Sequence, residues 1–299
     1  MLLANIHDFI GNIEPSSYNL LNYYEKVEQL AKLANTSKKI AFYGHPDQKT
    51  INIFMKYGFK FLDLDINLKS KKQKIVSDVY CHIIRDIIDN AIGLKSEIEY
   101  IICTSGRDKC DQGRNVRDVL SQLDFKLIDA SNYNTTPLRK PIISMAKGNL
   151  KERVIRIMEL VYKPLTEKEK EYYIKMRCNP SFNYHGVPPQ DIDMLSIFPD
   201  NTHIQGWTRL VEMGIPYRVD LEWQIDNKLP SVYFSQSFCN KQLMSEFLAN
   251  KNNGLYIDGH GTVTNSIKVK LEAFLSLKSK NKILKNENNC ESYFSGVRR

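Results

Sequence analysis

Short apolar segments alternate with amphipathic segments through the first half of the chain, and this alternation constrains the fold more than any other feature. Four runs have the length and composition of buried strands, and helical patterns separate them. The runs are 39–43, 59–66, 98–103 and 125–130. Strands that alternate with helices usually pair in parallel. The pattern therefore predicts a Rossmann-like, mostly parallel sheet in an N-terminal lobe.

The second half repeats this rhythm on a smaller scale, although no internal repeat survives comparison residue by residue. We expect strands there at 217–225, 231–238 and 255–258. The predicted class is α/β with two lobes. The predicted parts are a helical lead-in, a Rossmann-like lobe, a second α/β lobe with connecting helices, and a basic flexible tail: 1–38, 39–150, 151–277 and 278–299.

Charge and composition favour a cytoplasmic protein that handles small molecules. The net charge is +8, with much of the excess in a lysine run near residue 70 and in the tail. These runs lack the interleaved aromatic residues of single-strand binders, so nucleic acid is not an expected partner. No apolar run reaches the ~20 residues that span a bilayer, and no signal peptide is recognisable. The six cysteines include no CxxC pair and are expected to be reduced thiols.

The segment 177–191 has no strand or helix period, yet it is rich in prolines and hydrogen-bonding side chains. A structureless segment of this length inside a domain is usually functional or disordered, and its aromatic and proline content argues against disorder. We predict a rigid, site-forming loop that carries His185. A plain crossing between the two lobes is the alternative.

The first strand and the end of the second indicate a nucleoside pocket. Gly44 follows the run 39–43, and Asp63 and Asp65 stand about 20 residues later, where an acid can bind a ribose diol. The glycine pattern GxGxxG is missing, which makes a pyrophosphate cofactor doubtful. S-adenosylmethionine or a mononucleotide is the expected ligand. The alternative is that both acids only solubilise the strand end.

An anion pocket is predicted at the end of the third strand. Thr104, Ser105 and Arg107 stand between that strand and the next helix. Hydroxyls, the amides of a helix N-terminus and a guanidinium suit a phosphate or carboxylate. The sequence is not a P-loop, and Arg107 in a surface ion pair is the alternative.

Acid–base or nucleophilic chemistry is predicted from two histidines, an acid and a thiol. His260 lies between glycines, where Asp258 could orient its ring, and His185 is comparable. Cys239 ends an apolar strand. A strand that ends in cysteine, with His185-Gly186 upstream, is loosely similar to caspase-like thiol peptidases, although their alanine-cysteine signature is missing. A metal site needs three separated segments to meet, so none is assigned.

These features predict an enzyme, most readily a transferase, with its site between the lobes. The substrate expected is a small anionic or nucleotide-bearing molecule, with S-adenosylmethionine or a nucleotide as cofactor. The alternatives are a non-catalytic ligand-binding or complex-assembly protein, and a Cys/His hydrolase or metal-dependent enzyme. Self-association of the chain is left open.

Overall fold

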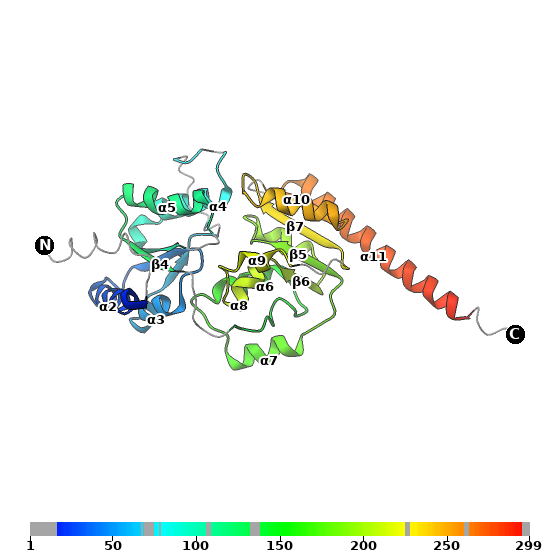
Figure 1. Ribbon diagram of the computed structural model, residues 1–299, viewed down its shortest axis with the longest axis horizontal. Helices are drawn as coiled ribbons and strands as arrows, with labels where there is room; N and C mark the ends of the chain where they lie inside the picture. The colour runs from blue at the N-terminus through cyan, green and yellow to red at the C-terminus, as the bar shows by residue number, and fades with distance from the viewer. Residues whose placement is uncertain are drawn as a thin grey trace.

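Two four-stranded sheets, each wholly parallel and interleaved with helices, make up the protein (Figure 1). This computed structural model confirms the predicted α/β class and the mostly parallel sheet of the first lobe. Backbone is described for residues 17–66, 68, 75–77, 79–105, 109–131, 138–224, 228–259 and 263–294. Side chains are described for the same residues except 17–21, 105, 131 and 280–294.

The first sheet has the order β2-β1-β3-β4, with every neighbouring pair parallel. Its strands are β1 (Lys39–Tyr43), β2 (Phe61–Asp63), β3 (Ile98–Ser105) and β4 (Leu127–Ser131). Its helices are α2 (Ser17–Leu33), α3 (Gln48–Lys56), α4 (His82–Gly93), the short η1 (Lys95–Glu97) and α5 (Asp111–Gln122).

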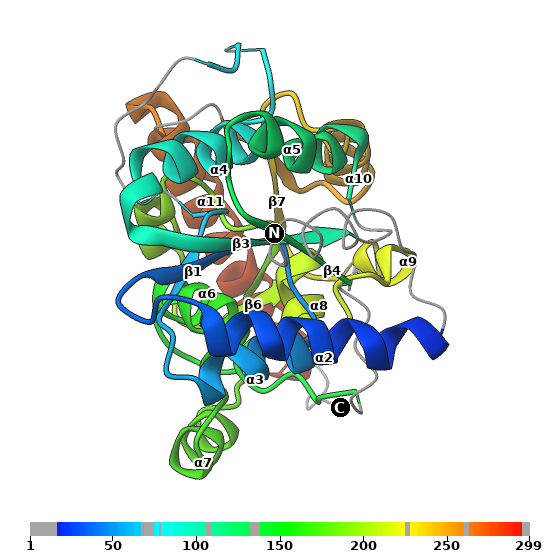
Figure 2. The ribbon, with the colours of Figure 1, turned by 90° about the vertical axis from the view of Figure 1, so that its left-hand side faces the viewer.

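Both faces of the first sheet are buried. Ile40 and Phe42 of β1 pack with α2 and α3, whereas Ala41 and Tyr43 pack with α4 and α5. Figure 2 shows the two helix layers on opposite sides of the strands. Side chains alternate along a strand, so β1 must be apolar throughout, which is why the sequence identified it as a continuous run.

The second sheet repeats the same plan, with the order β6-β5-β7-β8 and parallel pairing. Its strands are β5 (Phe182–Gly186), β6 (Thr202–Gln205), β7 (Ser231–Gln236) and β8 (Leu255–Gly259). Its helices are α6 (Leu150–Glu159), α7 (Glu167–Lys175), η2 (Ile192–Ile197), α8 (Trp207–Met213), α9 (Val219–Glu222), α10 (Gln242–Lys251) and α11 (Asn265–Phe294). In each sheet the first strand along the chain is flanked by the second and the third.

The prediction of a loop at 177–191 is wrong, because this segment contains β5. All five residues of β5 are buried, between β6 and β7. Its polar side chains read as loop residues in the sequence, but they find partners inside the lobe. Asn183 Nδ2 donates to Ser231 Oγ at 3.3 Å, and His185 Nε2 bonds the Glu222 carbonyl at 2.7 Å. Hydrogen bonds of this kind make a polar strand compatible with burial.

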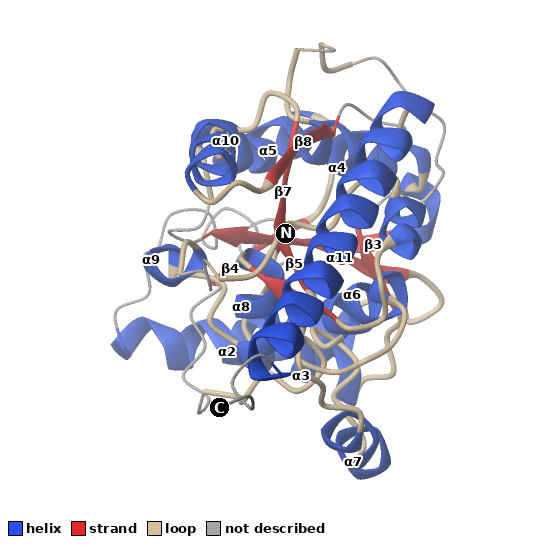
Figure 3. Cartoon of the chain, turned by 90° about the vertical axis from the view of Figure 1, so that its right-hand side faces the viewer, coloured by secondary structure: helices blue, strands red, loops and turns tan. Residues whose placement is uncertain are grey.

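The strand predicted at 217–225 is also wrong, since this segment forms the short helix α9. The edge beside β5 is already occupied by β6, a four-residue strand that the sequence analysis missed. Helix α11 packs on the second lobe with its first turns, continues past Leu277 to Phe294 and projects away from the lobe, toward the viewer in Figure 3. The mobility proposed for the tail stays a prediction. No helix in the described part of the chain is long and apolar enough to cross a membrane.

A buried carboxylate fixes the segment that enters the second lobe. Glu212 of α8 is 2% exposed and accepts the backbone N–H groups of Ile142, Ile143 and Ser144 at 2.7, 2.6 and 2.9 Å. The hydroxyl of Ser144 also donates to it. One side chain therefore supplies the acceptor for three consecutive backbone donors.

We predict that Glu212→Gln lowers the free energy of unfolding by about 2–4 kcal/mol, because hydrogen bonds to a charged acceptor are the strong ones. Urea denaturation followed by circular dichroism measures the change. Glu171→Gln on the exposed surface of α7 is the matched control and should change stability by less than about 0.5 kcal/mol. Equal effects of the two substitutions would contradict the proposed role of Glu212.

Candidate functional site

One cavity lies at the carboxyl ends of the strands of both sheets. Tyr43, Asp65 and Lys109 line it from the first lobe, and Gly186 and Gln236 from the second. Ligands of parallel α/β sheets bind outside this edge of the strands. The cavity opens to solvent, and small molecules bind preferentially in clefts of this kind.

The walls of the cavity are mostly apolar. Helix α4 contributes Ile83, Ile84 and Ile87, while α6 and β7 contribute Met158 and Phe234. Both tryptophans of the chain, Trp207 and Trp223, also line the cavity. Aromatic and aliphatic walls of this kind suit a flat ring such as a nucleobase. The fluorescence of the two indoles can therefore report on binding in the cavity.

The polar corner of the first lobe consists of Gly44, Asp65 and Lys109. The N–H of Gly44 donates to the carboxylate of Asp65. Gly44 has φ +73°, and a Cβ on it would lie 2.5 Å from Lys109 Nζ. The absence of a side chain therefore lets the ammonium group lie against the backbone at the end of β1. Lys109 Nζ is also 6.0 Å from the ring centroid of Trp207, across the cavity in the second lobe.

Asp63 contacts the backbone of Asp65 and does not itself line the cavity. Its carboxylate accepts the N–H of Asp65 at 3.0 Å. Burial raises the pKa of Asp63 well above its ordinary value, the charge of Asp65 raises it further, and Lys109 opposes both. Asp65, rather than Asp63, is therefore the acid placed to contact a ligand.

The polar corner of the second lobe is built around Glu222, which is 2% exposed. Lys241 Nζ bonds its two carboxylate oxygens at 2.8 and 2.7 Å. The backbone carbonyl of Glu222 is bonded to His185 Nε2. The imidazole of His185 stacks on the Trp223 ring, with centroids 5.4 Å apart and planes 22° apart. These contacts fix α9 and α10 against the end of β5.

His185 is neutral at physiological pH. Burial lowers its pKa to about 4, against the hydrogen bond to the Glu222 carbonyl, which raises it. A ring whose Nε2 donates to a carbonyl keeps its lone pair on Nδ1, and this atom has no hydrogen-bond partner among the described residues. At pH 7 the ring therefore offers a hydrogen-bond acceptor and is a weak base.

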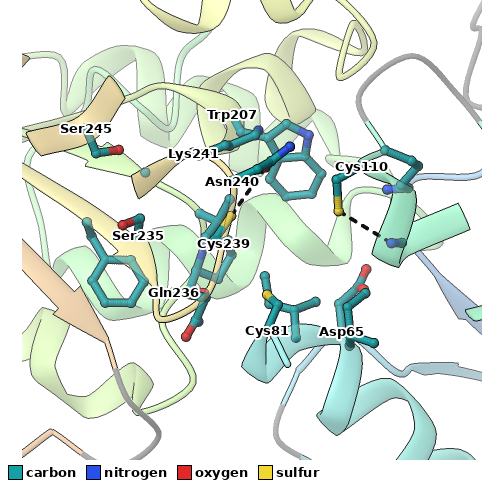
Figure 4. A pocket seen from close by; sticks show the side chains of 18 of the residues that line it. Asp65, Cys81, Cys110, Trp207, Ser235, Gln236, Cys239, Asn240, Lys241 and Ser245 are labelled. Atoms are coloured by element: carbon teal, nitrogen blue, oxygen red, sulfur yellow. Dashed lines mark hydrogen bonds between the residues drawn. The ribbon is translucent and has the colours of Figure 1, made fainter. Parts of the chain in front are cut away.

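Three thiols line the same cavity, as Figure 4 shows. Cys110 caps α5, where its sulfur accepts the N–H of Gly113 at 3.4 Å. Cys81 precedes α4, and Cys239 lies in the turn between β7 and α10. The Cys239 thiol donates to Asn240 Oδ1 at 3.8 Å, and Cys239 packs against the apolar cluster to which Cys81 belongs.

The structure brings some of the predicted site residues together. Asp65, His185 and Cys239 line the cavity, and Gly44 adjoins it. No hydrogen bond links the thiol of Cys239 to the imidazole of His185 among the described contacts, since the imidazole Nε2 is bonded to the Glu222 carbonyl.

Other predicted site residues lie elsewhere. Asp258 is exposed, and its carboxylate accepts a hydrogen bond from Ser237 Oγ at 2.6 Å. Thr104 is buried, and its hydroxyl donates to the Tyr43 carbonyl oxygen at 2.6 Å. The Ser105 side chain, Arg107 and His260 are outside the described residues, so their roles stay predictions. Within the described part of the chain, no group of three or more His, Cys, Asp or Glu side chains could hold a metal ion.

Several cavity residues were missed by the sequence analysis: Cys81, Lys109, Trp207, Glu222, Trp223 and Lys241. The two tryptophans could have been noticed in the sequence, because the chain has only these two. Lys109 directly follows the segment predicted to bind an anion. The remaining residues are recognisable only once the two lobes are placed side by side.

Comparison of this chain with known protein families and with curated proteins finds no match. Its function must therefore be inferred from the site itself.

We predict that stability falls in acid because of His185. Its folded pKa of about 4 lies below the ordinary 6.5, so the unfolded chain binds the extra proton first. The neutral His185 makes its full contribution to the free energy of unfolding above pH 6.5. As the pH falls from 6.5 toward 4, the free energy of unfolding decreases by about 3 kcal/mol. His185→Gln, which keeps a donor for the Glu222 carbonyl, should remove this part of the pH dependence.

Urea denaturation of both proteins at pH 7.5, 5.5 and 4.5 measures the effect. The difference in unfolding free energy between wild type and His185→Gln should shrink as the pH falls. A difference that stays constant over this range would contradict the assignment of a buried neutral imidazole.

Proposed function

We propose that the protein is an enzyme that transfers a group from a nucleoside-bearing donor to a second small molecule. The observation that supports this most directly is the meeting of two carboxyl edges at one cavity, lined by Tyr43 of β1 and Asp65 after β2 on one side and from β5 and β7 on the other. Each edge is a ligand site in parallel α/β proteins generally, so the arrangement provides two adjoining subsites. The inference uses this general behaviour of the fold together with the side chains present.

The first-lobe corner suits the donor. Asp65 stands at the end of β2, where a carboxylate can accept hydrogen bonds from ribose hydroxyls. The indole of Trp207 offers a surface for the base, and Lys109 offers a cation for a phosphate or a carboxylate. Gly44 alone replaces the glycine-rich turn that a pyrophosphate needs. S-adenosylmethionine or a mononucleotide fits this corner better than a dinucleotide.

The second-lobe corner suits the acceptor. Gln236 Oε1 and His185 Nδ1 are buried hydrogen-bond acceptors without a partner among the described residues, and both side chains line the cavity. Buried polar atoms usually have partners, because leaving them unpaired is costly. A hydroxyl or amine of a bound molecule would supply the missing donors. Glu222 and Lys241 add one charge of each sign beside them.

Tryptophan fluorescence tests the proposal directly, since both indoles of the chain lie in the cavity. The ligands to titrate are S-adenosylmethionine, S-adenosylhomocysteine, ATP, GTP and NAD. We expect a saturable change with one nucleoside ligand. Lys109→Met should weaken the binding of that ligand about 10- to 100-fold, through the loss of one charge-assisted hydrogen bond.

Lys39→Met is the matched control, because Lys39 pairs with Glu97 at the opposite, amino end of β1. It should bind like the wild type. If no nucleoside ligand changes the fluorescence, the donor proposed here is wrong. If Lys109→Met and Lys39→Met bind the ligand equally, the ligand lies elsewhere.

A non-catalytic ligand-binding protein is the second candidate, and the state of the described polar groups favours it. Glu222 is held by Lys241, and His185 is neutral with its Nε2 bonded to the Glu222 carbonyl. Neither is arranged as a strong base. Chemistry would then depend on His260. If His260→Ala abolishes consumption of the bound donor but keeps its affinity, the protein is an enzyme. If the wild type returns the donor unchanged, the binding function holds.

A further inference from the structure

Two thiols from different lobes meet in the cavity. Cys81 is the N-cap residue of α4 in the first lobe, and Cys239 lies in the turn before α10 in the second. Cys239 packs against the apolar cluster of the first lobe to which Cys81 belongs, and both side chains line the same cavity. Figure 4 shows both side chains in the cavity. The two cysteines therefore stand on opposite lobes where these meet at the cavity.

The surroundings give the two thiols different roles. The neighbouring thiol of Cys81 lowers the pKa of Cys239 to about 7, against its burial, and the backbone N–H and charge of Lys241 lower it further. The same contact raises the pKa of Cys81, and so does burial. The nucleophilic form of cysteine is the thiolate, so Cys239 is the reactive partner and Cys81 the resolving one.

We propose that Cys81 and Cys239 form a reversible disulfide that joins the two lobes when the protein encounters a hydroperoxide. The Cys239 thiolate attacks one oxygen of hydrogen peroxide, the O–O bond breaks, and Cys239 becomes a sulfenic acid while one water leaves. The sulfur of Cys81 then attacks the Cys239 sulfur, the S–O bond breaks, and the proton of Cys81 leaves in a second water. Two thiols lose two electrons, the peroxide gains them, and a dithiol reductant reverses the step.

The third thiol of the cavity provides the matched control. Cys110 also lines the wall, but its sulfur is hydrogen-bonded to the N–H of Gly113 within its own helix start. A cross-link that depends only on exposure to peroxide would include Cys110. A cross-link that depends on the contact between the lobes would not.

The experiment treats the full-length protein at pH 7.5 with a small excess of hydrogen peroxide, blocks remaining thiols with iodoacetamide, and maps non-reduced peptides by mass spectrometry. We expect one species that lacks two hydrogens and links the peptides of Cys81 and Cys239, and dithiothreitol should reverse it. The cross-link closes a long loop, so the melting temperature should rise by roughly 5–10 °C. Cys110→Ser should behave like the wild type.

Two further variants separate the steps. Cys81→Ser should stop at a sulfenic acid on Cys239, which dimedone captures, and Cys239→Ser should leave Cys81 reduced. A link that involves Cys110 or Cys290 would overturn the proposal, and so would a wild type that keeps sulfenic acid without a cross-link. Tryptophan fluorescence of each reduced variant confirms that it is folded. Because the readout is mass, it is independent of whether the cavity binds a nucleoside.

Discussion

Burial of β5 is the constraint on which the second lobe depends. The strand lies between β6 and β7, so Asn183 and His185 must find hydrogen-bond partners inside the protein. His185 finds one in the carbonyl of Glu222, and this bond ties the central strand to α9. The carboxylate of the same residue holds Lys241, just before α10. One chain of contacts thus runs from β5 through α9 to α10 and shapes one wall of the cavity.

In the first lobe the buried strand β1 consists mainly of apolar residues, so its side chains need few hydrogen-bond partners. The polar groups of this lobe lie at the end of the strand. Strand β1 is followed by Gly44, and strand β5 ends at Gly186, where each reaches the cavity. Lys109 lies against Gly44, and a Cβ on Gly186 would lie 2.6 Å from the Phe234 carbonyl oxygen. Both strand ends lie at the carboxyl edge of their sheet, and the two edges line one cavity. The cavity therefore follows from the plan of the two sheets rather than from a single loop.

This difference explains which features could be predicted from the sequence. The strands β1 and β3 are nearly continuous apolar runs, so local pattern identified them, and the rule that ligands bind at strand ends selected Asp65 and Cys239. The strands β5 and β6 are polar and short, so the same patterns missed them. Lys109, Cys81 and Lys241 gain their place from contacts between segments far apart in the chain. No local pattern encodes such contacts.

The turn between β7 and α10 carries residues of both the proposed ligand site and the proposed disulfide. It carries Cys239, which packs against the first-lobe cluster that contains Cys81, and Lys241, which forms an ion pair with Glu222. Glu222 in turn holds His185 at the end of β5. A disulfide at Cys239 would therefore fix both the distance between the lobes and the position of Lys241. Any ligand that uses Glu222 or Lys241 would meet a different wall in the oxidised protein, so the redox state of one thiol pair would act on the whole second-lobe corner.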